Sequence, residues 1–221
     1  MKTLWIALVL AAVVAGFALS RSGGANPGVD GYGTTAAFEG IVQERPYGML
    51  HVPAPDGTLR AFLLVGPGKT GAATAVADQH GAWARVQGTL IERADLAVLE
   101  VHAVEPLDRP PLGLPVPVEV ESVALRGEIV DTKCALGRMK PGSGVLHREC
   151  AIRCIRGGIP PTLMVAAGAD VRFYLLADPE GAAANDLVLD FVGDPVEVRG
   201  LLHHQGPLPV LHVARAGIRR L

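Results

Sequence analysis

The stretch Arg60-Ala-Phe-Leu-Leu-Val-Gly-Pro67 recurs as Arg172-Phe-Tyr-Leu-Leu-Ala-Asp-Pro179, 112 residues further along the chain. Two further pairs of segments keep this spacing: 84–90 with 196–202, and 98–101 with 210–213. Similarity that persists at one spacing over several segments is the signature of an internal repeat. We therefore interpret the chain as two halves that share one structural plan.

Each half is a series of short apolar and β-branched runs separated by glycine and proline, which is typical of strands. In the first half these runs cover 38–43, 49–52, 60–65, 82–90 and 97–104. Five strands are the plan of an OB-type barrel, and we expect a short helix before the fourth strand, at 71–79 and 183–192. The predicted fold class is mostly β, with two tandem OB-like five-stranded barrels. A single larger β-sandwich is the alternative.

Composition divides the chain further. The apolar run 4–19, followed by small residues, predicts a signal peptide or an N-terminal membrane anchor over 1–20. Both interpretations place the rest of the chain in the periplasm or another extracytoplasmic compartment, either membrane-anchored or secreted. The remaining predicted segments are a flexible tether over 21–35, the first barrel over 36–107, a proline-rich linker over 108–120 and the second barrel over 121–221.

Charge and aromatic content argue against nucleic acid as a partner. The 20 Lys+Arg and 22 Asp+Glu give a net charge of −2, so the chain has no overall attraction for a polyanion. The second half has few aromatic residues for stacking on bases: Phe173, Tyr174 and Phe191. The segment Gly66-Pro-Gly-Lys-Thr70 resembles the end of a phosphate-binding loop, but that pattern requires glycine where Leu63 stands. We interpret it as a turn and predict no nucleic-acid partner.

The second half is about 24 residues longer than the first, and the extra residues lie between its first two strands, at 131–161. This insertion holds every cysteine of the chain. Ser143 before it and Gly157-Gly158 after it bracket a predicted helix over 145–156. At about 100° per residue, three side chains fall within roughly 60° of one another: His147, Cys150 and Cys154. We expect the imidazole and both thiols to share one helical face.

Cys134 lies on the loop before this helix and could supply a fourth ligand. Three sulfur donors and one nitrogen donor suit zinc, copper(I) or iron, and do not suit magnesium or calcium. We therefore predict a metal ion or metal centre of unknown identity, with these ligands: Cys134, His147, Cys150 and Cys154. Met139 is a further candidate ligand. His203 and His204 are two more, because we place them in the loop between strands four and five of the second barrel.

Two other interpretations of the cysteines stay open. In an oxidising compartment Cys134 could form a disulfide with Cys150 or Cys154, and the chain would then be a non-catalytic assembly subunit. A thiol activated by His147 could instead make it a thiol oxidoreductase. The sequence assigns no catalytic residue and leaves open whether the chain is an enzyme.

The insertion reads Asp131-Thr-Lys-Cys134, then Met139-Lys-Pro-Gly142, then His147-Arg-Glu-Cys150-Ala-Ile-Arg-Cys154-Ile-Arg-Gly-Gly-Ile-Pro-Pro161. This signature resembles that of a group of uncharacterised bacterial exported or membrane-anchored proteins, and the resemblance covers roughly the second half of the chain. Together with the ligand pattern, it leads us to expect an exported, membrane-tethered metal-binding or redox accessory protein. Its partner would be a larger membrane protein complex that carries out electron transfer.

Overall fold

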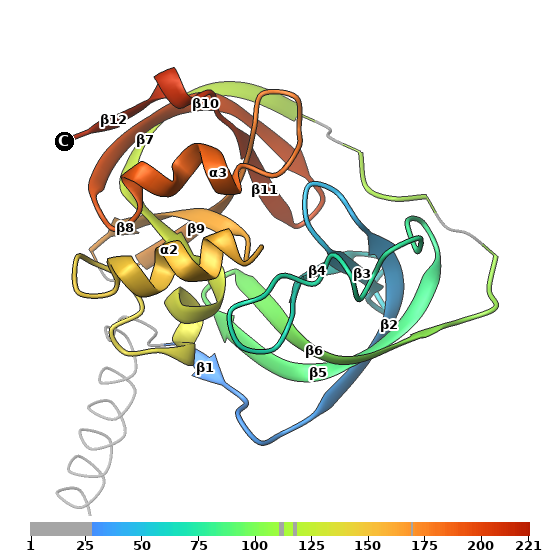
Figure 1. The fold of residues 1–221 in the computed structure, drawn as a ribbon. Coiled ribbons are helices and arrows are strands. Elements are labelled where there is room, and N and C mark those ends of the chain that lie inside the picture. The colour runs from blue at the N-terminus through green and yellow to red at the C-terminus, as the bar shows by residue number, and fades with distance from the viewer. Residues whose placement is uncertain (1–27, 111–112, 117–118, 169) are drawn as a thin grey trace, which may run out of the picture.

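The computed structural model describes residues 28–110, 113–116, 119–168 and 170–221. In these ranges the chain forms two closed β-barrels that lie side by side (Figure 1). The predicted signal peptide or membrane anchor at 1–20 lies outside the described residues. No helix within the described ranges has the length and apolar character that crossing a membrane requires.

The first barrel is built from five strands: β2 (Ala36–Gln43), β3 (Met49–Pro53), β4 (Leu59–Val65), β5 (Trp83–Arg93) and β6 (Leu96–Pro106). Its strand order is β5-β2-β3-β4-β6, and pairing of β5 with β6 closes the ring. The β4–β6 pair is parallel and the other pairs are antiparallel. A short strand β1 (Val29–Asp30), within the segment predicted as a tether over 21–35, pairs with β5.

The second barrel repeats this plan with β7 (Glu119–Asp131), β8 (Pro161–Ala167), β9 (Asp170–Ala177), β10 (Pro195–Gln205) and β11 (Leu208–His212). Pairing of β10 with β11 closes it, and β9 and β11 form the one parallel pair of the ring. The strand β12 (Ile218–Arg220) adds to β10. A five-stranded ring whose third and fifth strands are parallel has the OB-type topology. The prediction of two tandem OB-like barrels is confirmed.

The helix before the fourth strand is present in one barrel only. In the second barrel it is α3 (Asn185–Val188), continued by η2 (Leu189–Phe191). In the first barrel the prediction of a helix at 71–79 is wrong, because this segment forms a series of turns. Asp78 has a φ of 62°, which lies in the left-handed region and does not continue a right-handed helix.

The insertion forms η1 (Cys134–Arg138) and α2 (Arg148–Arg156). The helix begins three residues later than predicted, because Gly144 has a φ of 80° and 145–147 form a turn. It ends as predicted, before a glycine pair in which Gly158 has a φ of 97°. Figure 1 shows η1 and α2 beside the second barrel, on the side that faces the first.

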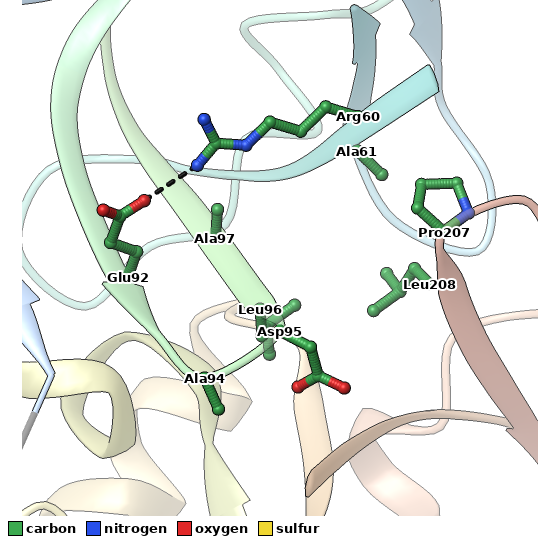
Figure 2. Close-up of a pocket in the computed structure, with 9 residues that line it drawn as sticks. All are labelled: Arg60, Ala61, Glu92, Ala94, Asp95, Leu96, Ala97, Pro207 and Leu208. Carbon is green, nitrogen blue, oxygen red and sulfur yellow. Dashed lines mark hydrogen bonds and ion pairs between the residues drawn. The ribbon is translucent and has the colours of Figure 1, made fainter. Parts of the chain in front are cut away.

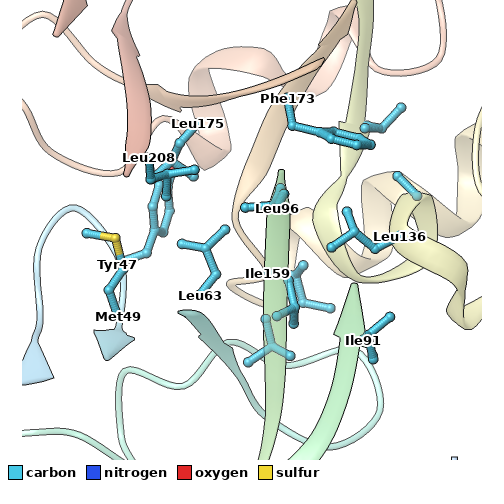
Figure 3. Packing of buried hydrophobic residues seen from close by; sticks show 14 of the residues in the cluster. Tyr47, Met49, Leu63, Ile91, Leu96, Leu136, Ile159, Phe173, Leu175 and Leu208 are labelled. Atoms are coloured by element: carbon cyan, nitrogen blue, oxygen red, sulfur yellow. The ribbon is translucent and has the colours of Figure 1, made fainter. Parts of the chain in front are cut away.

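A shared hydrophobic cluster joins the two barrels and the insertion (Figure 3). It combines Met49 and Leu63 of the first barrel with Leu136 and Ile159 of the insertion and Phe173 of the second. Each barrel also has a core of its own, and the core of the second includes Ala151 and Ile155 of α2. The helix α2 is therefore packed on both sides.

One side chain ties the barrels together by hydrogen bonds as well. The hydroxyl of Tyr47, which is buried in the first barrel, donates to the Leu176 carbonyl at 2.9 Å. The same oxygen accepts the Ala184 N–H at 2.8 Å. Burial raises the pKa of Tyr47 well above its usual value, so the hydroxyl keeps its proton and can serve as donor and acceptor at once. The relative placement of the barrels thus rests on directional bonds in addition to apolar contact.

Candidate metal centre

Three cysteines from two elements converge on one point. Cys134 begins η1, directly after the end of β7, while Cys150 and Cys154 lie one turn apart on the inner face of α2. All three are free, and their Sγ atoms lie within 4.8 Å of one another. Cys134 and Cys154 are buried, and Cys150 is half-buried. The predicted convergence of Cys134 with the two helical thiols is present in the structure.

His147 lies on the other side of Cys134 and pairs with a carboxylate. Its Nε2 is 3.1 Å from Oδ2 of Asp131, which is 0% exposed, and Oδ1 of Asp131 accepts the Cys134 N–H at 2.9 Å. The ligating atoms of Asp131, Cys134 and His147 also lie within 4.8 Å of one another. The structure therefore does not gather the four predicted ligands around one point. Cys134, Cys150 and Cys154 form one group, and His147 forms a second group with Cys134 and Asp131.

Asp131 is a site residue that the sequence reasoning did not single out, although it opens the signature of the insertion. A fully buried carboxylate requires partners, and Asp131 has them in the imidazole and in the backbone N–H of Cys134. It fixes the start of η1 and the orientation of the His147 ring together. The signal in the sequence was an acidic residue at the end of an apolar strand.

A lysine from the first barrel reaches the sulfur cluster. The Nζ of Lys69 donates to Cys150 Sγ at 2.8 Å and to Cys154 Sγ at 3.5 Å. Lys69 lies in the segment 66–70, which forms a turn, as predicted. Nothing in the local sequence indicates which part of the second barrel that turn meets. The contact joins residues of different barrels and depends on how the barrels dock.

Two sets of hydrogen bonds hold this turn against the insertion. The buried Lys133 donates through Nζ to the carbonyl oxygens of Gly66 at 2.9 Å and Gly68 at 2.8 Å. The N–H of Gly71 donates to the Gly157 carbonyl at 2.8 Å. A Cβ at Gly157 would lie 1.8 Å from the Lys69 carbonyl oxygen, so only glycine allows this close approach. Contacts from both barrels therefore fix the position of Lys69 beside the thiols.

The cysteines differ in acidity. The pKa of Cys154 falls to about 7, chiefly because the Cys134 thiol donates a hydrogen bond to it, and the Lys69 ammonium adds to this effect while burial opposes it. The pKa of Cys134 is raised by the same hydrogen bond, by burial and by the nearby charge of Asp131. Cys154 therefore ionises before Cys134, which donates the hydrogen bond to it. The thiolate is the form that binds metals and attacks electrophiles.

A pocket of about 460 Å³ leads to these sulfurs, and its lining includes Cys134, Cys154, Lys69 and Met139. Met139, the predicted additional ligand, lines this pocket and is 48% exposed. The other charged side chains of the lining form ion pairs: Lys133 with Glu100, and Arg138 with Glu100 at 2.7 Å and Asp30 at 3.1 Å. The wall of the pocket therefore holds paired charges around a sulfur-rich floor.

The structure does not bring His203 and His204 to this site. Both lie on β10, where they pair with Val120 and Glu119 near the start of β7, whereas Asp131 is the last residue of β7. The His203 ring stacks on that of His212 with centroids 3.9 Å apart, and His204 Nε2 is 3.1 Å from Glu121 Oε1. Because β10 is longer than expected, the pair lies within the strand rather than in a loop.

A second pocket lies between the barrels, where the β10–β11 turn approaches the first barrel (Figure 2). It measures about 140 Å³, and Pro207 and Leu208 contribute its wall from the second barrel. Figure 2 shows the Arg60–Glu92 ion pair at its edge, with a separation of 2.8 Å. The described lining holds no thiol or imidazole, so the ligand chemistry is concentrated in the cysteine pocket.

No protein-family model and no curated protein matches this chain. Among solved structures, a deletion mutant of the single-stranded DNA binding protein from Thermus aquaticus matches at 14% identity, with 89% of each chain covered and a TM-score of 0.23. We withdraw the prediction of no nucleic-acid partner, and a likeness with a TM-score of 0.23 supports no statement about which partner this chain binds. The described barrels and the sulfur cluster, rather than this likeness, carry the proposals below.

Proposed function

We propose that this chain is an extracytoplasmic accessory protein that binds one thiophilic metal ion through Cys134, Cys150 and Cys154. The observation that carries the proposal is the convergence of three free sulfurs within 4.8 Å. Sulfurs that share one ion at about 2.3 Å each lie roughly 4 Å apart. The observed cluster therefore has the size that a single ion needs, and small side-chain rotations can complete the geometry.

The surroundings of the cluster favour ion binding and exchange. Cys134 and Cys154 line an open pocket, so an ion can enter and leave without unfolding of the barrels. Asp131 holds Cys134 in place through its backbone N–H, and α2 holds the other two sulfurs at one-turn spacing. Ligands held by rigid elements need little reorganisation on binding. The first barrel has the same strand plan and no cysteine, and it contributes Lys69 to the site.

Metal content and thiol reactivity test this proposal. The full chain is purified under reducing conditions without chelators, and the bound metal and the thiols open to alkylation are counted before and after chelation. We expect one ion per chain, three thiols protected by that ion, and loss of the ion in Cys150→Ser and Cys154→Ser. Arg153→Ser, on the exposed face of the same helix, is the matched control and should keep the ion. Unchanged metal content in both cysteine variants would contradict the proposal.

Thiol–disulfide exchange is a second candidate function, and the contact of Lys69 with Cys150 and Cys154 favours it. A cation beside a half-buried thiol is the environment of a reactive cysteine. In this reaction two protein thiols would become a disulfide while a substrate disulfide becomes two thiols. Turnover of a model disulfide by metal-free protein in the presence of a dithiol would support it. Absence of turnover together with stoichiometric metal would leave metal binding as the function.

A further inference from the structure

We infer that the ion is monovalent and soft, namely Cu(I), and that Met139 is its first ligand on the way in. This inference rests on the proposed metal-binding function and goes beyond it by choosing among the ions that the cysteines could hold. Three features of the described residues lead to it: the composition of the donor group, the position of Lys69 and the position of Met139.

The donor group that surrounds one point consists of sulfur alone. Cys134, Cys150 and Cys154 form one three-atom group, and His147 belongs to the other group, in which it pairs with Asp131. A structural zinc site takes four ligands in a tetrahedron, whereas the nitrogen that would be the fourth does not share this group. Thiolate and thioether donors select Cu(I), which binds stably with two or three ligands. The cluster therefore fits Cu(I) without rearrangement of His147.

The positive charge of Lys69 favours a monovalent ion over a divalent one. An ion bonded to Cys150 Sγ at about 2.3 Å would lie within roughly 5 Å of Nζ of Lys69, because that nitrogen is 2.8 Å from the same sulfur. Coulomb repulsion is proportional to the charge of the ion, so the ammonium repels a divalent ion twice as strongly as a monovalent one. Lys133 and Arg138, the other cations of the pocket lining, are paired with Glu100 and Asp30. Lys69 is thus the cation that an incoming ion faces.

Met139 supplies a soft donor at the pocket. It lines the same pocket as Cys134 and Cys154, and about half of its side chain is exposed. A neutral thioether binds Cu(I) and has little affinity for Zn(II). The ion would bind Met139 first and then pass to the thiols, each of which releases its proton to solvent as the sulfur–metal bond forms. Neither the ion nor the sulfur changes oxidation state in these steps.

The test measures Cu(I) and Zn(II) binding to the full chain in the absence of oxygen, by competition with bathocuproine disulfonate for Cu(I) and a chromogenic chelator for Zn(II). We expect one Cu(I) per chain and slower Cu(I) uptake in Met139→Leu. Met164→Leu is the matched control, because Met164 packs against the shared cluster of the two barrels. Equal uptake rates in Met139→Leu and the wild type would overturn the role of Met139.

Lys69→Met tests the charge argument. Removing one positive charge at this distance should raise the affinity ratio of Zn(II) to Cu(I) by about tenfold to a hundredfold, and Lys69→Arg should keep the original ratio. Lys69 is exposed, so neither change removes part of a core. An unchanged ratio in Lys69→Met would overturn the argument.

Cobalt(II) separates failure of this inference from failure of the proposed function. A stoichiometric tetrahedral Co(II) spectrum with three sulfurs and one nitrogen, lost in His147→Gln, would show that the site takes a divalent ion with His147 as ligand. That result would overturn the Cu(I) inference and leave metal binding intact. Binding of none of the three ions would instead overturn the proposed function itself.

Discussion

The two barrels have the same strand plan and differ most in the connection between their first two strands. In the first barrel, 44–48 join β2 to β3, whereas in the second, 132–160 join β7 to β8 and contain η1 and α2. The first barrel closes its ring without cysteines, so closure does not need them. The barrel therefore forms without cysteines, and the connection between the first two strands of the second barrel holds all three of them.

The longer connection is also structural. Leu136 and Ile159 contribute to the cluster between the barrels, and Ile155 contributes to the core of the second barrel. A loop that only carried ligands would not need fully buried apolar side chains on two sides. The insertion therefore has a packing role in addition to the proposed metal-binding role, and the predictions below separate the two.

The largest effect is expected when 132–160 are replaced by the short connection 44–48. The exchange removes three fully buried apolar side chains, each of which contributes about 2–5 kcal/mol, a total comparable with the whole stability of about 5–15 kcal/mol of a typical domain. We expect early amide hydrogen exchange throughout the second barrel. Protection should persist in the first barrel, whose own core does not include the insertion. Unchanged protection in both barrels would contradict a structural role of the insertion.

Leu136→Ala sharpens the same point with one residue. Leu136 is 0% exposed and lies between the barrels, so its truncation should lower the free energy of unfolding by about 3 kcal/mol. Leu146, in the same insertion, is 88% exposed, and Leu146→Ala should change stability by less than about 0.5 kcal/mol. Urea unfolding measures both. Equal effects of the two variants would contradict the placement of η1 in a shared core.

A histidine in the first barrel offers a comparison by pH. His51 pairs with Ile41, and the equivalent pair in the second barrel is Leu163 with Ile129. Burial lowers the pKa of His51 from 6.5 to about 4, so the unfolded chain binds a proton more readily than the folded one. This contribution to stability is present above about pH 6.5 and is lost as the pH falls toward 4.

We expect a loss of about 2 kcal/mol between pH 7 and pH 4.5 from this group. His51→Leu copies the second barrel and should remove that part of the pH dependence. Unfolding by urea at both pH values, in the wild type and the variant, measures the difference. The same loss in both proteins would show that other groups cause the pH dependence.

The smallest effect concerns the charge that the first barrel supplies to the second. The pKa of Cys154 is about 7, and the Lys69 ammonium is one cause of this low value. In metal-free protein, Lys69→Met should shift the midpoint of thiolate formation, followed by absorbance near 240 nm, to higher pH. Lys140→Met, at an exposed position of the insertion, is the control and should leave the midpoint in place. A midpoint that does not move in Lys69→Met would show that the hydrogen bond from Cys134 alone lowers the pKa.

The sequence by itself determined the two barrels and the helical face of the cysteines. Strands and helices are recognised in a sequence by apolar residues that recur with periods of about 2 and 3.6 residues. The constant spacing of 112 residues showed that the same series of strands occurs twice. The one-turn spacing of Cys150 and Cys154 followed from the same geometry. Local patterns failed where the backbone departed from helical conformation. Asp78, with a positive φ, lies in the series of turns that replaces the helix predicted at 71–79, and Gly144, also with a positive φ, precedes the turn that delays the start of α2.

Only the tertiary structure decided which residues surround the sulfurs. Lys69 meets Cys150 across 81 residues of chain, and Asp131 meets His147 across the turn that precedes α2. The register of β10 with β7 placed His203 and His204 at the far end of the strand. Such contacts depend on how the barrels dock and how strands align. A periodic pattern defines which face of an element is apolar, but does not define which distant residue lies opposite that face.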